Sequence, residues 1–453
     1  MQALTRLHRF FLLTLTLFFC GCAAGGHQDF AALADREREQ FQEGIGMEGE
    51  RQAAILNHLI RSTDLEALVD EALAANPGLQ QTLLTLRIRQ GQYRQTSGER
   101  WPEITAGYAA DRKEGSDTSY AGSISIGWEI DLWSKLADDI RAAAKDMAEQ
   151  QALYQSARDS LTAQVMKTWL GLTAAHKNVT IELERLATFE NTETFILQRY
   201  RSGLCTLADL DSAQSATAAS RVTLEGYREI LAQQKRVLKN LLGRKPGMEI
   251  TAPEEYATVL VPLAELPAQT LQRRPDLKAA YLAIEAATLR ARVAYKELLP
   301  LINLQAALED VASSPAQALL TDPVWSLLAR LTAPLFQGGK LRAAAQIAEL
   351  KTARSYQAYR ETLYRAVQEI KDTIGLEHSI TRQLGHMETA LAKAQNNLHQ
   401  YQRRYRTGLV EILDLLAVQR QAYDLEIQRN NLVYKRLANR VNLGLALGLG
   451  VKQ

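Results

Sequence analysis

The chain has 453 residues, which is enough for two or three ordinary domains or for one very elongated domain. Its 53 basic and 51 acidic side chains leave a formal net charge of +2, and this balance gives no support to nucleic-acid binding. Aromatic residues make up only 7% of the chain and there are only 11 prolines, so its long runs of Ala, Leu, Gln, Arg and Glu favour helix.

The N-terminus is typical of a targeting segment. A basic start leads into an apolar stretch over residues 10–20, which is too short to span a bilayer as a helix. The stretch ends in Phe-Phe-Cys-Gly-Cys, which resembles a lipobox, the bacterial motif in which a Cys becomes the lipidated first residue. We predict a lipoprotein signal over residues 1–21 and lipidation of Cys22, which follows the small Gly21. The alternative is an ordinary signal peptide cut near Gly25.

Cysteine use beyond the signal is sparse. Only Cys22 and Cys205 would remain in the mature chain, so we expect no structural disulfide even though the signal implies export. We interpret Cys205 as a small apolar residue. No other stretch reaches 18 apolar residues, so the mature protein would enter a membrane only as a β-barrel or through its lipid.

Helices dominate the first half of the chain. The predicted segments are an N-terminal extension over residues 22–60, a helix over 61–100 broken at Asn76-Pro77, a proline-free helix over 132–201, a helix over 206–242 and a linker over 246–263. The proline-free helix would extend about 100 Å at about 1.5 Å per residue. Helices of globular proteins average about 11–12 residues, so this length indicates an unusual, elongated architecture.

The same pattern restarts in the second half. Helices are predicted over residues 266–299 with a break at Pro275, over the proline-free stretch 337–406, and over 410–447. The chain would therefore consist of two repeats, one over residues 61–245 and one over residues 264–450.

Two constant offsets support an internal duplication. Asn76-Pro77-Gly78-Leu79 matches Arg274-Pro275-Asp276-Leu277, 198 residues later. The phrase RYRSGLCTLADLD at residues 199–211 matches RYRTGLVEILDLL at residues 404–416, 205 residues later. The seven extra residues fall in one place, around residues 310–323. Chance similarity between helices would not preserve the positions of proline and glycine in both repeats.

Each repeat also contains a pair of predicted strands. In residues 123–132, Ile124, Ile126 and Trp128 alternate with polar or small residues, and a period of two indicates a strand. The four predicted strands span about residues 103–111, 121–132, 301–311 and 324–335. Ten residues suit a tilted transmembrane strand, but four strands cannot close a barrel, so several chains would have to share one. The alternative is two soluble hairpins packed on a helical body.

These features together resemble the TolC family of outer-membrane efflux proteins, in particular its OprM-like and NodT-like lipoprotein branch. The resemblance covers about residues 60–450. It rests on the paired helix starts at Asn76-Pro77 and Arg274-Pro275, on Pro102 and Pro300 before the strands, on Gly338-Gly339, and on the two Tyr-x-x-Gly-Leu phrases.

The resemblance implies a mainly α fold with a small β part. Three identical chains would form an α-helical barrel across the periplasm and a twelve-stranded transmembrane β-barrel, with four strands from each chain. The implied partners are a periplasmic adaptor (membrane fusion) protein, an inner-membrane pump of the resistance-nodulation-division class, and outer-membrane lipid. The protein would be a lipid-anchored, passive exit duct for small molecules or ions, without a cofactor.

The polar strand faces would line the barrel lumen. The residues expected there are Glu129, Asp131, Glu309 and Arg330. Aromatic side chains, among them Tyr108, Trp128 and Trp325, would face lipid or its interfaces.

The repeated phrase predicts a helix-turn-helix tip in each repeat. Gly203 and Gly408 suit the left-handed position that ends a helix. Thr206 and Asp209 have the spacing of a capping box, with Asp in place of the usual Glu.

The acids near the tips are candidates for a pore constriction. They are Asp209, Asp211, Glu411 and Asp414. Threefold symmetry would turn each into a ring of carboxylates, which attracts cations and repels anions. The resemblance implies a constriction at Asp414 and a tip held closed by Tyr405 and Asp209. A second acid ring is not expected, because its place holds Ala417, and Val410 replaces an Arg that helps to close the tip in some relatives.

Other functions have weaker support. The seven histidines form no metal-ligand pattern, and the chain has no phosphate-binding, nucleophile-elbow or dinucleotide motif, so we expect neither catalysis nor a metal centre. A type I protein-secretion channel and a periplasmic coiled-coil lipoprotein scaffold remain alternatives. The scaffold would explain the helices and Cys22, but it would not explain alternating strands at matching offsets.

Overall fold

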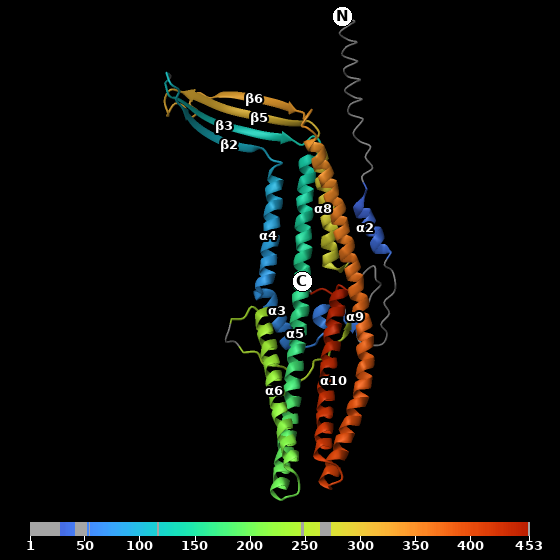
Figure 1. Cartoon of the computed structure of the whole chain (residues 1–453). Coiled ribbons are helices and arrows are strands. Elements are labelled where there is room, and N and C mark those ends of the chain that lie inside the picture. Colours follow the sequence, from blue (N-terminus) through green and yellow to red (C-terminus); the bar gives the residue numbers. More distant parts are fainter. Residues whose placement is uncertain are drawn as a thin grey trace.

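The computed structural model describes residues 28–40, 52–53, 55–115, 117–245, 249–262 and 273–451. The predicted signal and Cys22 lie outside these residues, as does the start of the second repeat at residue 264. The molecule is long and narrow, with a β-sheet at one end and two helical tips at the other (Figure 1). Within the described residues, no helix is both long and apolar enough to cross a membrane.

From α4 in the first repeat and α8 in the second, the described parts of the two repeats fold into equivalent series of elements. The first comprises α3 (Thr63–Ala75), α4 (Pro77–Gly98), β2 (Glu103–Asp111), β3 (Ser119–Ile130), α5 (Lys135–Arg201) and α6 (Leu207–Leu241). The second comprises α8 (Pro275–Lys296), β5 (Leu301–Ala312), β6 (Val324–Thr332), α9 (Lys340–Arg406) and α10 (Ile412–Ala446). Helices α4 and α8 have 22 residues each, α5 and α9 have 67 each, and α6 and α10 have 35 each. These equal lengths are what a duplication predicts.

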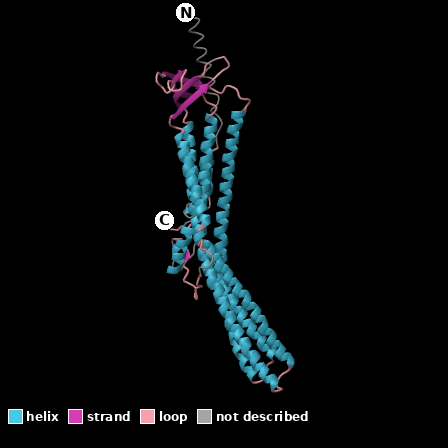
Figure 2. Ribbon diagram, turned by 90° about the vertical axis from the view of Figure 1, so that its left-hand side faces the viewer, coloured by secondary structure: helices cyan, strands magenta, loops and turns pink. Residues whose placement is uncertain are grey.

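The long helices α5 and α9 run from the sheet to the tips. In each repeat a 22-residue helix lies beside the sheet-proximal part of the long helix, and a 35-residue helix lies beside the tip-proximal part (Figure 1). Figure 2 shows the same arrangement from the side, with the sheet at one end and the two helical hairpins at the other. The predicted breaks are confirmed, because Pro77 and Pro275 each begin a helix, where a proline has no amide to leave unpaired.

Two predicted strands extend too far. The sequence predicts strands to residues 132 and 335, but β3 ends at Ile130 and β6 ends at Thr332. Beyond these points the chain turns into α5 and α9, whose N-caps Ser134 and Gly339 both have positive φ, of 57° and 82°. Alternation of apolar residues continues past the strand ends, so it could not locate these turns.

The four strands form one antiparallel sheet in the order β2-β3-β5-β6. Its register places like side chains in rows across the strands. One apolar row is Ile104, Ile126, Ala306 and Leu327, and another is Ala106, Ile124, Leu308 and Trp325. The sheet therefore has one apolar face and one mostly polar face, as predicted, and the apolar face includes exposed side chains such as Trp325 (74% exposed).

The largest buried cluster lies in the middle of the rod, where the ends of several helices meet the linker and the C-terminus. It includes Leu59, Trp169, Leu242 and Val441. Here β1 (Gln52–Ala53) pairs in parallel with β4 (Val261–Pro262), and η1 (Leu56–His58) lies nearby. The Asp159 carboxylate accepts a hydrogen bond from the amide of Val451 (2.9 Å), which fastens the C-terminus to α5.

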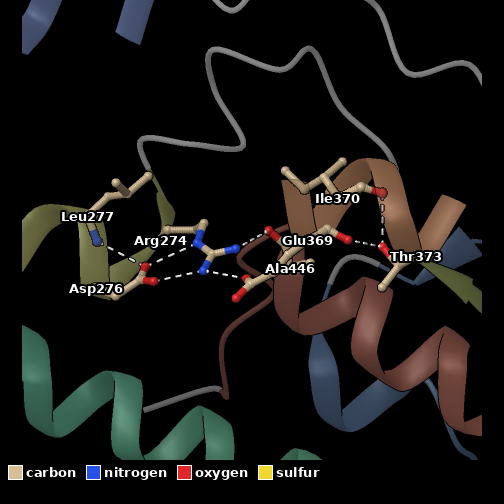
Figure 3. A network of polar contacts seen from close by, with 7 residues as sticks. All are labelled: Arg274, Asp276, Leu277, Glu369, Ile370, Thr373 and Ala446. Atoms are coloured by element: carbon tan, nitrogen blue, oxygen red, sulfur yellow. Dashed lines mark hydrogen bonds and ion pairs between the residues drawn. The ribbon is translucent and has the colours of Figure 1, made fainter. Parts of the chain in front are cut away.

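Arg274 joins three helices of the second repeat (Figure 3). This buried residue is the N-cap of α8. Its guanidinium contacts Asp276 (2.7 Å), Glu369 of α9 (2.9 Å) and the carbonyl of Ala446 at the end of α10 (3.1 Å). In the first repeat the equivalent Asn76 caps α4 with its side chain and donates to the Leu241 carbonyl (2.9 Å). In both repeats this residue connects the start of the 22-residue helix to the end of the 35-residue helix. The first repeat makes the connection with a side-chain amide, and the second makes it with a charged network.

Part of the predicted N-terminal extension packs against the second repeat. Helix α2 (Phe30–Glu39) lies along α9, as Figure 1 shows. Glu37 binds Arg360 (2.8 Å) and accepts a hydrogen bond from Tyr356 (3.0 Å), and Ala34 is fully buried.

Candidate functional site

The two helical tips are built on the same turn. Gly203 and Gly408 have φ of 72° and 74°, a conformation that favours glycine. The amide of Leu204 donates to the carbonyl of Arg199 (2.8 Å), and Leu409 makes the equivalent bond to Arg404 (2.9 Å). These bonds span five residues and, with a shorter bond from each glycine amide, form the motif that commonly closes a helix at a glycine. The predicted turns are therefore present in both tips.

In the first tip, Asp209 helps to cap the start of α6. The Thr206 hydroxyl accepts a hydrogen bond from the Asp209 amide (3.2 Å), and the Asp209 carboxylate accepts one from the Thr206 amide (2.8 Å). This is the predicted capping box. The hydrogen bonds from Thr206 hold the pKa of Asp209 below its usual range. The carboxylate is therefore ionised and bound to its own turn.

The second tip uses its acids differently. Glu411 is the N-cap of α10, and within the described chain its side chain makes no capping bond. Asp414 lies in the first turn of α10, where the helix dipole favours a negative charge, and its side chain is exposed. The position equivalent to Asp209 thus presents its carboxylate to solvent.

Tyr405 holds the two tips together. It is only 7% exposed and lies in an apolar cluster that includes Ile196, Leu210 and Leu415 from both repeats. Its ring packs edge-on against Phe195, with centroids 6.1 Å apart, and the guanidinium of Arg199 lies 5.6 Å from its centroid. Burial raises the pKa of the Tyr405 phenol, so this group stays neutral.

Phe195 and Arg199 were not predicted. They come from α5 and lie four residues apart, so they share one face of the helix. That spacing just before the glycine turn is a signal in the sequence, but only the fold shows that Tyr405 of the other repeat fills the space beside them.

Asp211 lines a groove of about 660 Å³ between α6 and α10. Its other walls include Ser215, Leu413 and Arg420. Deeper in the bundle, the fully buried Glu182 accepts a hydrogen bond from Ser220 (2.6 Å) and contacts Arg185 (3.3 Å), which also binds Asp424 of α10 (3.0 Å). The two hairpins are thus joined by polar contacts as well as by the apolar cluster.

At the sheet, the structure places three of the four predicted lumen residues on the polar face. Glu129 lies opposite Asn303, which lies opposite Arg330, and Glu309 lies opposite Ser123. Asp131 does not belong to this face. It follows the end of β3, and its carboxylate accepts hydrogen bonds from the amides of Leu136 (3.1 Å) and Ala137 (2.9 Å) at the start of α5. The sequence analysis did not foresee this role, in which the acid caps a helix.

Metal ligands do not cluster among the described side chains. In that part of the chain, no group of three or more His, Cys, Asp and Glu side chains could hold a metal ion.

Two proteins of known type resemble this chain in sequence over most of its length. Outer membrane protein OprJ of Pseudomonas aeruginosa is 27% identical over 463 residues, which cover 97% of this chain and 95% of OprJ. The cation efflux system protein CusC of Escherichia coli O6:H1 is 24% identical over 400 residues, which cover 86% of each chain.

Solved structures have the same fold. The outer-membrane channel OprN superposes with a TM-score of 0.82 at 20% identity, covering 88% of this chain and 93% of OprN. A crystal structure of CusC gives 0.79 at 21% identity, covering 90% of this chain and all of that one. The predicted fold class is confirmed. The model of the outer membrane efflux protein family matches residues 68–244 and 266–449, which correspond to the two repeats. The chain therefore belongs to the outer membrane efflux protein family.

Proposed function

We propose that three copies of this chain form one continuous exit duct, with the sheets closed into a twelve-stranded barrel in the outer membrane and the helices forming a tube in the periplasm. The observation that carries this proposal is the sheet. It has an apolar face, a polar face and two open edges, at β2 and β6. Open edges cannot remain unpaired in lipid, so further strands must come from other copies.

The tips would form the periplasmic end of the duct. In a trimer the exposed Asp414 would occur three times around the pore, and such a ring favours cations. Glu411 lies close by in sequence and would add to the same field. Asp209 and Tyr405 would instead hold each tip in shape, while Asp211 would lie in the groove between the hairpins.

The duct would work with a periplasmic adaptor and an inner-membrane pump, for which we propose the resistance-nodulation-division class. The pump would supply the energy and choose the cargo. The names of relatives mention cations, pyoverdine and toluene, so the shared role is conduction of small molecules or ions. One relative from Salmonella typhimurium is named a probable outer membrane lipoprotein, which supports lipidation at Cys22.

Single-channel recording tests this proposal. Protein purified from outer membranes should form trimers and conduct ions in planar bilayers. Replacement Asp414→Ala should raise the leak and weaken block by polyvalent cations, because the carboxylate ring is lost. Replacement Asp209→Ala is the matched control, and it should leave cation block nearly unchanged. Unchanged conductance and block in Asp414→Ala would remove the ring assignment, and a monomer without channel activity would overturn the duct itself.

A further inference from the structure

The turn between β5 and β6 is longer than its counterpart between β2 and β3. Residues 310–323 join equivalent positions of the second hairpin, whereas only residues 112–118 do so in the first. Strand β5 also continues past the end of β6, because residues 310–312 still pair with β3. We call residues 313–323 the insertion loop. Both turns lie at the end of the sheet that is remote from the helices (Figure 1).

The insertion loop rests on one row of the sheet. Tyr108, Gly122 and Asp310 lie opposite one another on β2, β3 and β5. The Tyr108 hydroxyl donates a hydrogen bond to the carbonyl of Pro315 (3.2 Å). A Cβ atom on Gly122 would overlap the carbonyl oxygen of Ala318, which is itself a fully buried residue. The loop backbone therefore lies directly on Gly122.

Asp310 fastens the returning part of the loop. Its carboxylate accepts hydrogen bonds from the Thr321 hydroxyl (3.3 Å) and from the Asp322 amide (3.1 Å), and the residue is only 7% exposed. Just before these contacts, Leu320 has a φ of 60°, which residues other than glycine rarely adopt. Such a conformation persists where the surrounding contacts fix it, so the loop has a defined seat on the sheet.

The row under the loop belongs to the apolar face of the sheet. Side chains alternate along a strand, so Gly122 and Asp310 share a face with the row that contains Ile124 and Trp325, two residues away. In an outer-membrane barrel the apolar face points to lipid and the polar face points to the lumen. The loop thus lies on the lipid side, where it also covers the Asp310 carboxylate.

The composition of the two turns fits this difference in place. Residues 112–118 include four charged side chains, whereas the insertion loop has only Asp322, at its return to β6. Leu319 of the loop is 67% exposed, and Trp325 on the adjoining row is 74% exposed. The loop therefore extends the apolar surface of the sheet toward its outer end.

We propose that the insertion loop lies outside the barrel, contacts the hydrocarbon of the outer lipid leaflet and leaves the pore exit uncovered. This inference rests on the proposed duct and adds the place and the partner of one loop. On the opposite face of β5, the 62% exposed Val311 would face the water of the pore. Leu319 and Val311 are therefore a matched pair of probes for the two environments.

Spin-label collision measurements test the place of the loop. In a Cys205→Ser background, a nitroxide is attached at Leu319→Cys or at Val311→Cys, and the protein is reconstituted into phosphatidylethanolamine–phosphatidylglycerol vesicles. Oxygen concentrates in lipid, whereas a nickel chelate stays in water. We expect the label at Leu319→Cys to collide more with oxygen and the label at Val311→Cys to collide more with the chelate. The Cys205→Ser protein alone measures any labelling of Cys22.

A second variant tests the seat of the loop. Gly122→Ala should displace the loop, because the added methyl group meets backbone that no side-chain rotation can move. The label at Leu319→Cys should then become more mobile and lose its preference for oxygen. Gly127→Ala is the matched control on the same strand, since its Cβ would meet open space, and it should leave the label unchanged. Equal effects of the two alanines would show that the loop is not seated on Gly122.

Shortening the loop tests whether it obstructs the exit. Deletion of residues 314–320 removes the seven extra residues and gives the second turn the length of the first. Single-channel conductance should remain unchanged, because the loop lies outside the pore. A higher conductance would show that the loop covers the exit and would overturn the inference.

The collision measurements give a decisive result even if the deletion prevents folding. Preference of the label at Leu319→Cys for the nickel chelate would place the loop in water, and protection from both reagents would place it under protein. Either result overturns the lipid contact, while the duct stands if the same sample conducts ions. If the unmodified protein neither forms trimers nor conducts, the proposed function itself fails.

Discussion

The two helical tips have nearly the same sequence and the same glycine turn, yet they place equivalent side chains in different roles. Asp209 is bound within a capping box, whereas Asp414 is exposed. Tyr200 is 40% exposed, whereas Tyr405 is 7% exposed and packs between the hairpins. The comparison shows that duplication preserved the turn, while neighbouring residues decided whether an acid stabilises the helix or faces solvent.

The largest expected effect comes from the tyrosines. Tyr405→Ala should remove about 3–5 kcal/mol of packing, as large-to-small changes at buried aromatic residues do. It should also free Arg199 and Phe195, loosen the tips and raise ion leakage. Tyr200→Ala, at the equivalent exposed position, should cost less than about 0.5 kcal/mol. Hydrogen exchange over the tips and conductance in planar bilayers measure both effects, and equal effects of the two variants would contradict the comparison.

Loss of the capping box should have a smaller effect. Thr206→Ala should destabilise the start of α6 by about 0.5–2 kcal/mol, because it removes the hydroxyl that accepts a hydrogen bond from the Asp209 amide. Glu411→Ala, at the equivalent position, removes no capping bond and should leave the start of α10 almost as protected as before. Hydrogen exchange of the first two turns of each helix provides the measurement. Matching losses in both helices would show that the tips do not differ in this way.

Introducing a capping box into the second tip should make the start of α10 resemble the start of α6. Glu411→Thr places Thr three residues before Asp414, which recreates the spacing of Thr206 and Asp209. The start of α10 should gain about 0.5–2 kcal/mol, and block by polyvalent cations should weaken because the Asp414 carboxylate turns toward its own helix. Glu411→Gln is the control, since it removes the same charge without a hydroxyl. Equal block by polyvalent cations in the two variants would argue against the expected capping bond to the Asp414 carboxylate.

The smallest effect concerns pH. The folded-state pKa of Asp209 lies below its usual value, so the cap contributes fully above the unfolded pKa, which is about 3.9. Its contribution should be lost as pH falls from there through the folded pKa. Protection at the start of α6 should decline over that acidic range, and Asp209→Asn should abolish the decline. A decline that persists in Asp209→Asn would assign it to another group.

The sequence by itself determined most of the architecture. Its two constant offsets showed the duplication, and its prolines and glycines marked helix starts and turns within a few residues. Strand alternation gave the two faces of the sheet, because a period of two is a direct consequence of strand geometry. The capping box of Thr206 and Asp209 was also readable, since it depends only on residues within one turn.

Tertiary structure decided what depends on distant contacts. The sequence could not show that β3 ends at Ile130 and that Asp131 caps α5, because alternation continues past the turn. It could not show that Tyr405 packs on Arg199, since these residues are 206 positions apart and meet only when the two hairpins lie side by side. The pairing of β3 with β5 likewise appeared only in the fold.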